Sequence, residues 1–296
     1  MTRTDLLITG LAPAIWGSSY IVTTSLLPGQ SPLLVALLRA LPAGLLLLLL
    51  VRQLPPNRWL PRLAILGALN FSLFWVLLFV SAYRLPGGVA ATLGAVQPLL
   101  VLLFSVPILG AQLRLTAAAA AGFSFVGVAL LVLTPDAELD AWGVLAGLGG
   151  AASMALGVVL TRKWQPPVPP LTFTAWQLTA GGLLLIPVTA LSLEALPSLD
   201  AGNLLGLAYM SLIGGALTYI LWFRGISRLE PSMVSLLGVF SPLTAVALGW
   251  IFLKEGLTVM QVAGAILALL SIWLGQSKLR LWRESRAPKG AINAPD

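Results

Sequence analysis

A single charged side chain, that of Arg39, falls deep within an apolar segment of this sequence. Arg39 lies about eight residues from the start of the segment 32–51, which corresponds to ~12 Å along a helix. Burying such a charge in a bilayer costs between ~3 and ~17 kcal/mol, and no Asp or Glu lies inside any apolar segment to pair with it. We expect Arg39 either to face a wet cavity, where it attracts a carboxylate or organises backbone carbonyls, or to extend to the membrane surface in a structural role.

Aromatic and amide side chains accompany Arg39 in the apolar segments. Small-molecule sites are mostly apolar with a few polar groups, and aromatic rings offer large contact surfaces to apolar or aromatic ligands. Each aromatic residue alone more often faces lipid or the protein core, but the deep aromatics, which include Phe71 and Tyr219, could as a set wall a cavity. Taken as a set with Arg39, the predicted substrate-binding residues are Trp16, Tyr20, Asn70, Phe74, Trp75, Gln97, Trp176, Gln177 and Tyr209.

Two prolines, Pro98 and Pro242, lie in the middle of apolar segments, each directly after a polar residue (Gln97 and Ser241). A proline inside a helix removes one backbone hydrogen bond and frees the carbonyl about four residues earlier. In a membrane that carbonyl must find another partner or line a cavity. We therefore predict that both prolines break helices beside the binding site and take part in gating; a simple packing kink is the alternative.

The residues expected of most enzymes are missing from this chain. It has no cysteine and no histidine, which excludes disulfides, thiolate metal sites and histidine proton relays. It also lacks a carboxylate pair, a nucleophile–base set and a phosphate-binding glycine loop. We expect no catalytic residue, no metal site and no cofactor. Because proton-driven carriers use buried acids or histidines, facilitated diffusion is the simpler mechanism, with proton coupling as the alternative.

The elements that carry these residues are predicted to be membrane helices. Hydrophobic residues make up 58% of the chain and charged residues 9%, against about 25% charged in soluble domains. A helix needs about 20 apolar residues to cross a bilayer. The first apolar run is expected to be the first such helix and not a cleaved signal. The ten predicted spans are 5–26, 32–51, 60–83, 86–109, 115–134, 141–161, 171–192, 203–223, 231–253 and 258–277.

The basic residues predict the orientation of these spans. The net charge of +7 sits at the ends of apolar segments, as expected for a membrane protein and not for a nucleic-acid-binding one. With both termini in the cytoplasm, 14 of the 17 Lys and Arg residues lie on the inner side, and only Arg84 and Lys254 lie outside. The basic, Pro- and Gly-containing tail 278–296 is expected to be disordered.

The second half of the chain repeats the first. At an offset of 144, residues 84–99 align with residues 228–243 and keep Arg, Leu, Gly and Pro in register. A similar match aligns 39–45 with 177–183. Because each half carries five spans, the second would cross the membrane inverted, with the substrate site between the halves. We thus predict an all-α membrane protein with ten transmembrane helices, formed by repeats 1–134 and 135–277 around a central cavity.

These motifs resemble those of a known family. The run Trp16-Gly17-Ser18-Ser19-Tyr20, the arginine at 39, the stretch 84–99 and the step Lys254-Glu255 before Leu257-Thr258 are similar to the EamA type of the drug/metabolite transporter superfamily. This resemblance implies a basket-like fold, a central cavity and alternating access in a bacterial inner membrane. Within the family, the chain is most similar to bacterial exporters of aromatic amino acids.

The function expected from these features is export of small amino acids and related metabolites, with aromatic ones favoured. Arg39 or helix N-termini would hold the carboxylate, and the aromatic residues would hold the side chain. The expected partners are this substrate and the lipid bilayer, without nucleic acid; the sequence leaves the oligomeric state open and is compatible with a monomer. The alternatives are a proton-coupled exporter of drugs or other metabolites and, more remotely, a membrane-embedded enzyme.

Overall fold

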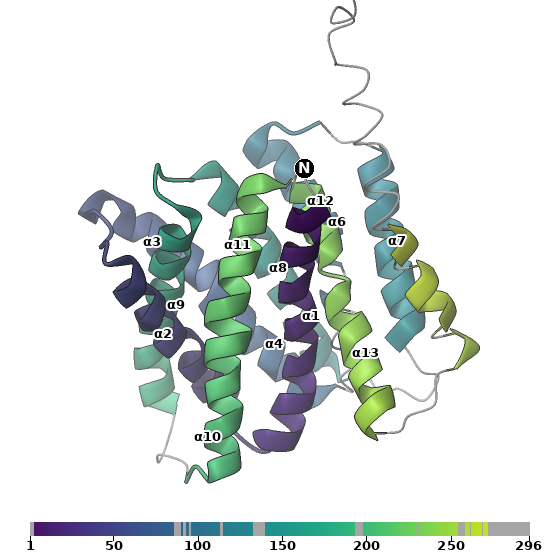
Figure 1. Cartoon of the computed structure of the whole chain (residues 1–296), viewed down its shortest axis with the longest axis horizontal. Helices are drawn as coiled ribbons and strands as arrows, with labels where there is room; N and C mark the ends of the chain where they lie inside the picture. The colour runs from purple at the N-terminus through teal and green to yellow at the C-terminus, as the bar shows by residue number, and fades with distance from the viewer. Residues whose placement is uncertain are drawn as a thin grey trace, which may run out of the picture.

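The computed structural model shows a bundle of helices (Figure 1). It describes residues 3–85, 90, 93–94, 96–112, 115–132, 140–192, 198–229, 231–253, 258–260, 262–267 and 269–271. Within these residues every regular element is helical and none is a strand, which confirms the predicted all-α class. The predicted tail 278–296, the residues Pro86–Val89 and the Lys254-Glu255 step lie outside the described part of the chain.

Six helical segments are long and apolar enough to cross a membrane. All backbone hydrogen bonds of a helix are satisfied within the segment, so Leu- and Ala-rich runs of this length are stable in lipid. Four of the segments are single helices, two in each half of the chain, and two are composite. The six are α1 (Arg3–Leu26), α2 (Pro32–Val51), η1–α3–η2–α4 (Asn57–Trp59, Leu60–Gly67, Ala68–Ser72 and Leu73–Arg84), α8 (Ala141–Lys163), α9 (Pro170–Ser192) and α10–η3–α11 (Ala201–Ala208, Tyr209–Leu217 and Thr218–Arg228).

Shorter apolar helices occupy the other four predicted spans. They are α6 (Gln97–Leu109), α7 (Leu115–Val132), α13 (Phe240–Leu253), which follows α12 (Pro231–Leu237), and a helix within Val262–Ser271. Each lies within a segment predicted from hydropathy. The number of membrane crossings remains a prediction, because these four are shorter than the six long segments.

The helix ends follow local sequence signals. Pro32 occupies the first turn of α2, where its missing N–H costs no hydrogen bond. The Asp140 carboxylate accepts from the Gly143 N–H at 2.6 Å and starts α8, and Asp200 and Asn203 form a capping box at the start of α10. α6 ends at Gly110, whose φ of +64° is favourable for glycine.

Two of the long segments correspond residue for residue. Asn57–Arg84 and Ala201–Arg228 each contain 28 residues and are related by the offset of 144. Each is interrupted by a π-helical stretch, η2 at Ala68–Ser72 and η3 at Tyr209–Leu217. π-Helical turns are rare and are frequently found at functional sites. The second segment runs through to Arg228, beyond the end at 223 predicted from hydropathy.

The helices pack in reciprocal pairs. α2 lies along α9, and both contribute a glycine at the crossing: a Cβ on Gly44 would lie 2.6 Å from the Thr179 nitrogen, and one on Gly182 would lie 2.7 Å from the Leu41 Cα. In the alignment of 39–45 with 177–183, Leu41 matches Thr179 and Gly44 matches Gly182. The same contact is therefore made twice, with the partners exchanged.

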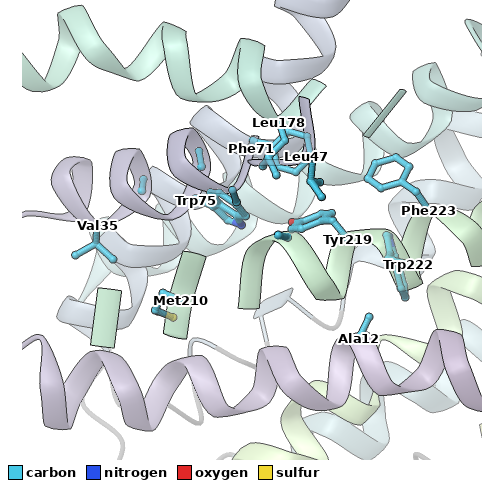
Figure 2. Packing of buried hydrophobic residues seen from close by; sticks show 14 of the residues in the cluster. Ala12, Val35, Leu47, Phe71, Trp75, Leu178, Met210, Tyr219, Trp222 and Phe223 are labelled. Carbon is cyan, nitrogen blue, oxygen red and sulfur yellow. The ribbon is translucent and has the colours of Figure 1, made fainter. Parts of the chain in front are cut away.

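Other helix contacts are reciprocal in the same way. α4 and α6 pack against α8, whereas α11 and α13 pack against α1, which Figure 1 shows lying between them. Helices of each half thus lie against the first helix of the other half. Between these groups lies the aromatic core, in which Phe71, Trp75 and Tyr219 are at most 1% exposed (Figure 2).

Candidate functional site

A cavity of about 140 Å³ lies between the two halves of the chain. Its wall is built by α1, α2, α4, α6, α7, α8, α11 and the region around α13, so neither half forms it alone. Among the described lining residues Arg39 is the only charged one. The aromatic lining residues are Trp16, Tyr20, Phe74, Trp75, Phe79, Tyr219 and Trp222, and the uncharged polar ones are Ser19, Thr23, Ser81, Gln97, Ser124 and Ser241.

The aromatic rings contact one another across the halves. The ring centroids of Trp16 lie 5.1 Å from Tyr219 and 5.0 Å from Trp222, and those of Trp75 and Tyr219 lie 5.7 Å apart. Figure 2 shows Trp75 and Tyr219 side by side, projecting from separate helices. Tilted and edge-to-face pairs at these distances are favourable, so these contacts stabilise the packing of the two halves at the wall.

Arg39 is held inside the protein by neutral groups. Its side chain is 3% exposed; Nη2 donates to the Gly214 carbonyl at 2.9 Å and Nη1 to the Ser19 hydroxyl at 3.2 Å. The guanidinium carbon lies 4.6 Å from the centre of the Trp75 ring, a cation–π distance. No acidic side chain of the described residues forms an ion pair with it. Arg39 therefore does not extend to the surface and keeps its positive charge available in the cavity wall.

The Gly214 carbonyl that anchors Arg39 belongs to η3. It also accepts hydrogen bonds from the Trp16 indole at 3.2 Å and from the Thr218 hydroxyl at 2.8 Å. A carbonyl of this π-helical stretch thus helps to hold the guanidinium in the cavity wall.

Three polar atoms of the cavity residues have no hydrogen-bond partner among the described residues: Arg39 Nε, Ser81 Oγ and Trp222 Nε1. All three side chains are at least nine-tenths buried, at 3%, 2% and 3% exposed. Leaving a buried donor without a partner costs about 1–3 kcal/mol, and such exceptions in a folded protein require an explanation. Because the three residues line one cavity, a ligand that accepts hydrogen bonds there would remove the penalty.

The two predicted helix breaks lie at the cavity. α6 begins at Gln97 with Pro98 in its first turn, and α13 begins at Phe240 with Pro242 close behind. Gly94 and Gly238, four residues before each proline, also line the cavity; the Gly238 carbonyl accepts from the Ser241 N–H at 3.0 Å. The prolines therefore start new helices instead of kinking continuous ones. The N-terminal ends of α6 and α13, which favour negative charge, lie at the cavity.

The sequence profile of the EamA-like transporter family matches this chain over residues 4–133 and 141–275. The chain belongs to the EamA-like transporter family. It is therefore a multi-pass membrane transporter of small metabolites, and its superfamily is that of the drug/metabolite transporters.

Individual relatives agree with this assignment. The EamA-like chain is 47% identical to the protein PecM of Dickeya dadantii over 263 residues, covering 86% of each chain. It is 30% identical to the uncharacterized transporter YvbV of Bacillus subtilis, over 98% of this chain and 95% of that one. It is 31% identical to the uncharacterized inner membrane transporter YedA of Escherichia coli K12, over 79% and 78%.

The fold of this EamA-like transporter also occurs in a solved crystal structure. The two superpose with a TM-score of 0.77 at 18% sequence identity, over 95% of this chain and 100% of that chain. At this identity the likeness establishes the arrangement of the helices alone.

The structure brings together eight of the residues predicted for the site of this EamA-like transporter. Six predicted substrate-binding residues and both predicted helix-breaking prolines line the cavity: Trp16, Tyr20, Arg39, Phe74, Trp75, Gln97, Pro98 and Pro242.

The other four predicted residues lie elsewhere. Asn70 and Gln177 belong to a buried amide network in which Asn70 Nδ2 donates to the Thr161 hydroxyl at 2.9 Å and to Gln177 Oε1 at 2.8 Å. The Trp176 indole donates to the Gln53 carbonyl at 2.6 Å. The Tyr209 hydroxyl is hydrogen-bonded to Ser18. None of the four is among the described cavity residues.

Sequence reasoning missed part of the second-half wall. Trp222 was not predicted, and Tyr219 was expected only as one of the deep aromatics that could wall a cavity; both line the cavity. The repeat would have indicated them, since Tyr219 lies 144 residues after Trp75 and Trp222 lies 144 residues after Leu78, and both Trp75 and Leu78 are lining residues. No comparable feature of the sequence indicated Ser81 as a cavity residue.

Proposed function

We propose that this EamA-like transporter exports small amino acids and related metabolites, aromatic ones favoured, by alternating access across the bacterial inner membrane. The observation that carries the proposal is the cavity between the halves, whose described wall combines seven aromatic rings with one cation, Arg39. Aromatic substrates would stack on the rings, and their carboxylate would approach Arg39 and the starts of α6 and α13.

Reciprocal packing supports the proposed architecture of ten spans in two inverted repeats, with both termini in the cytoplasm. The family profile matches two successive segments. The segments 57–84 and 201–228 share their limits at the offset of 144. Two units related by a two-fold axis make each contact twice, with the roles of the partners exchanged. The α2–α9 crossing has this form, because Gly44 lies against Thr179 and its counterpart Gly182 lies against Leu41.

The size and polarity of the cavity favour a ligand with a planar ring. A cavity of ~150 Å³ can hold benzene, so the cavity of about 140 Å³ accommodates one ring of this size in the conformation observed. The donors Arg39 Nε and Trp222 Nε1 lack partners within the described residues and would suit acceptor atoms of the ligand. An ammonium group would rest on ring faces, which attract cations.

The composition of the cavity wall also indicates what drives transport. None of its described residues is an acid, and the chain has no histidine. Because proton-coupled carriers route protons through such groups, facilitated diffusion down the substrate gradient is the proposed mechanism. The single positive charge also disfavours lipophilic cations, the ligands of the alternative multidrug function.

The test is flux through the purified protein in liposomes. Vesicles loaded with unlabelled tryptophan should accumulate labelled tryptophan by exchange, and phenylalanine should compete while a lipophilic cation such as tetraphenylphosphonium should not. An imposed pH gradient should leave the initial rate unchanged. Competition by the cation alone would favour the multidrug function, and a strong response to the pH gradient would show proton coupling.

A further inference from the structure

Two ion-pair clusters join the halves of the chain. The Asp5 carboxylate lies 3.0 Å from Arg224 Nη2 and 3.3 Å from Arg228 Nη1, and the Asp140 carboxylate lies 3.5 Å from Arg84 Nη1. Arg84 and Arg228 are the last residues of the two corresponding segments and are related by the offset of 144. Each arginine pairs with the acid at the start of the other half's first helix, α1 or α8.

The clusters lie at opposite ends of the molecule. Asp5 is in the first turn of α1, and Figure 1 shows α1 beginning where α11 ends. At the far end of α1, the Leu27 carbonyl accepts from the Tyr83 hydroxyl at 3.1 Å, directly beside Arg84. Twenty-two residues separate Asp5 from Leu27, which is ~33 Å of helix.

The cavity lies closer to the Arg84 end. Along α1 its lining residues run from Trp16 to Thr23, so about eleven residues, or ~16 Å, of α1 separate it from Asp5. Tight packing fills this interval: Gly225 lies directly against the Thr9 side chain. At the other end the cavity reaches Ala82 and Ala90, close in sequence to Arg84.

The two clusters also differ in tightness. The Asp5 side chain is 12% exposed and contacts two guanidinium groups. The side chains of Arg84 and Asp140 are 50% and 38% exposed, and their single contact is longer. Exposed single pairs contribute little, whereas a shielded carboxylate with two partners holds more strongly. The tight cluster is at the end that is packed shut, and the weak one is at the end that the cavity approaches.

We infer that the two clusters are the gates of the transport cycle. Asp5 with Arg224 and Arg228 keeps the N-terminal, cytoplasmic end closed in the state observed, and Arg84–Asp140 tightens when the opposite end closes. Each pair ties a helix of one half to the first helix of the other, so a movement of the halves that loosens one pair strengthens its counterpart. The inference rests on the proposed alternating access.

The chain contains no cysteine, which permits a direct test by thiol labelling. A Cβ on Gly94, a cavity residue, would meet no heavy atom within 4 Å, so Gly94→Cys provides a tolerated reporter in the full-length protein. Membrane-impermeant maleimide would be applied to right-side-out and to inside-out vesicles. The readout is the ratio of the labelling rates from the cytoplasmic and outer sides.

In the Gly94→Cys background, Asp5→Asn should raise that ratio by about tenfold, the shift expected when a two-state equilibrium loses a shielded ion pair. Arg84→Gln should lower it. Arg58→Gln is the matched control, because Arg58 is an exposed residue at the start of η1. Should Asp5→Asn fail to fold, Arg228→Gln leaves the Asp5–Arg224 contact in place and should raise the ratio less.

Unchanged ratios in both gate variants, or shifts in the same direction, would overturn the inference. A thiol reached from one side only in every variant would overturn it as well. Because labelling requires no substrate, opposite shifts without flux of aromatic amino acids would support the gates and refute the proposed substrate instead.

Discussion

Trp75 and Tyr219 pack edge to face with their ring centroids 5.7 Å apart, although 144 residues separate them in the chain. They occupy the same position in the segments 57–84 and 201–228. Their contact therefore lies where the halves of the chain meet, and it forms part of the cavity wall. A ligand that stacks there would touch both halves at once.

The first prediction concerns Arg39. Arg39→Ala should lower the initial rate of tryptophan exchange by at least about tenfold, because a hydrogen bond to a charged group contributes ~1.5–3 kcal/mol. Folding should persist, since the Gly214 carbonyl keeps its bonds from Trp16 and Thr218. The matched control is Gln177→Ala, at the corresponding position but in the amide network; it should lower the melting temperature and spare the affinity. An unchanged exchange rate in Arg39→Ala would remove Arg39 from the site.

The second prediction concerns the indole N–H of Trp222. Trp222→Phe retains a ring and removes a buried donor that has no partner within the described structure. The KM should rise about 2- to 12-fold, the value of one neutral hydrogen bond, while the melting temperature in detergent stays the same or rises.

The control for Trp222 is Trp250→Phe, because Trp250 is 54% exposed. This variant should change neither quantity. A lower melting temperature in Trp222→Phe with unchanged KM would assign the indole to packing alone.

The third prediction concerns the α2–α9 crossing. Gly44→Ala would place a methyl group 2.6 Å from the Thr179 nitrogen, and overpacking of this kind costs about 1–3 kcal/mol. Gly182→Ala, which meets the Leu41 Cα at 2.7 Å, should lower the melting temperature by a similar amount. Gly122→Ala is the control, since its Cβ meets nothing within 4 Å. Equal melting temperatures in all three variants would contradict the close crossing.

The fourth prediction concerns the helix breaks. Pro98→Ala and Pro242→Ala restore a backbone N–H that can donate to Gly94 or Gly238, so the interrupted helices can become continuous. We expect kcat for exchange to fall several-fold in each variant with little change in KM, measured in liposomes. Pro107→Ala, within α6 but outside the cavity lining, should leave kcat unchanged. A rise in KM alone would assign the prolines to binding.

The helical class and much of the cavity could be predicted from sequence. Arg39 could be placed at a cavity because an unpaired charge in a membrane helix needs polar surroundings, and the structure provides the Gly214 carbonyl and Ser19. Asn70 and Gln177 are polar too, yet these two amides hydrogen-bond each other across helices. Nothing in the sequence distinguishes these two solutions.

The π-helical stretches explain why helical periodicity did not identify all residues of the cavity wall. One extra residue in a turn rotates every later residue by ~100° about the helix axis. η3 lies just before Tyr219 and Trp222, so a regular helix from Ala201 would direct these side chains elsewhere. Periodicity alone therefore could not identify them as cavity residues.

The matched positions of Arg39 and Gln177 have a consequence for how such a molecule can arise. Two identical subunits paired antiparallel about a two-fold axis would bring either two guanidinium groups or none to a shared pocket, and two would repel each other. Fusion of the subunits into one polypeptide lets a single cation remain, with its counterpart turned into the amide network. The described wall then carries a single positive charge, and the zwitterion proposed as substrate would enter the pocket in one orientation.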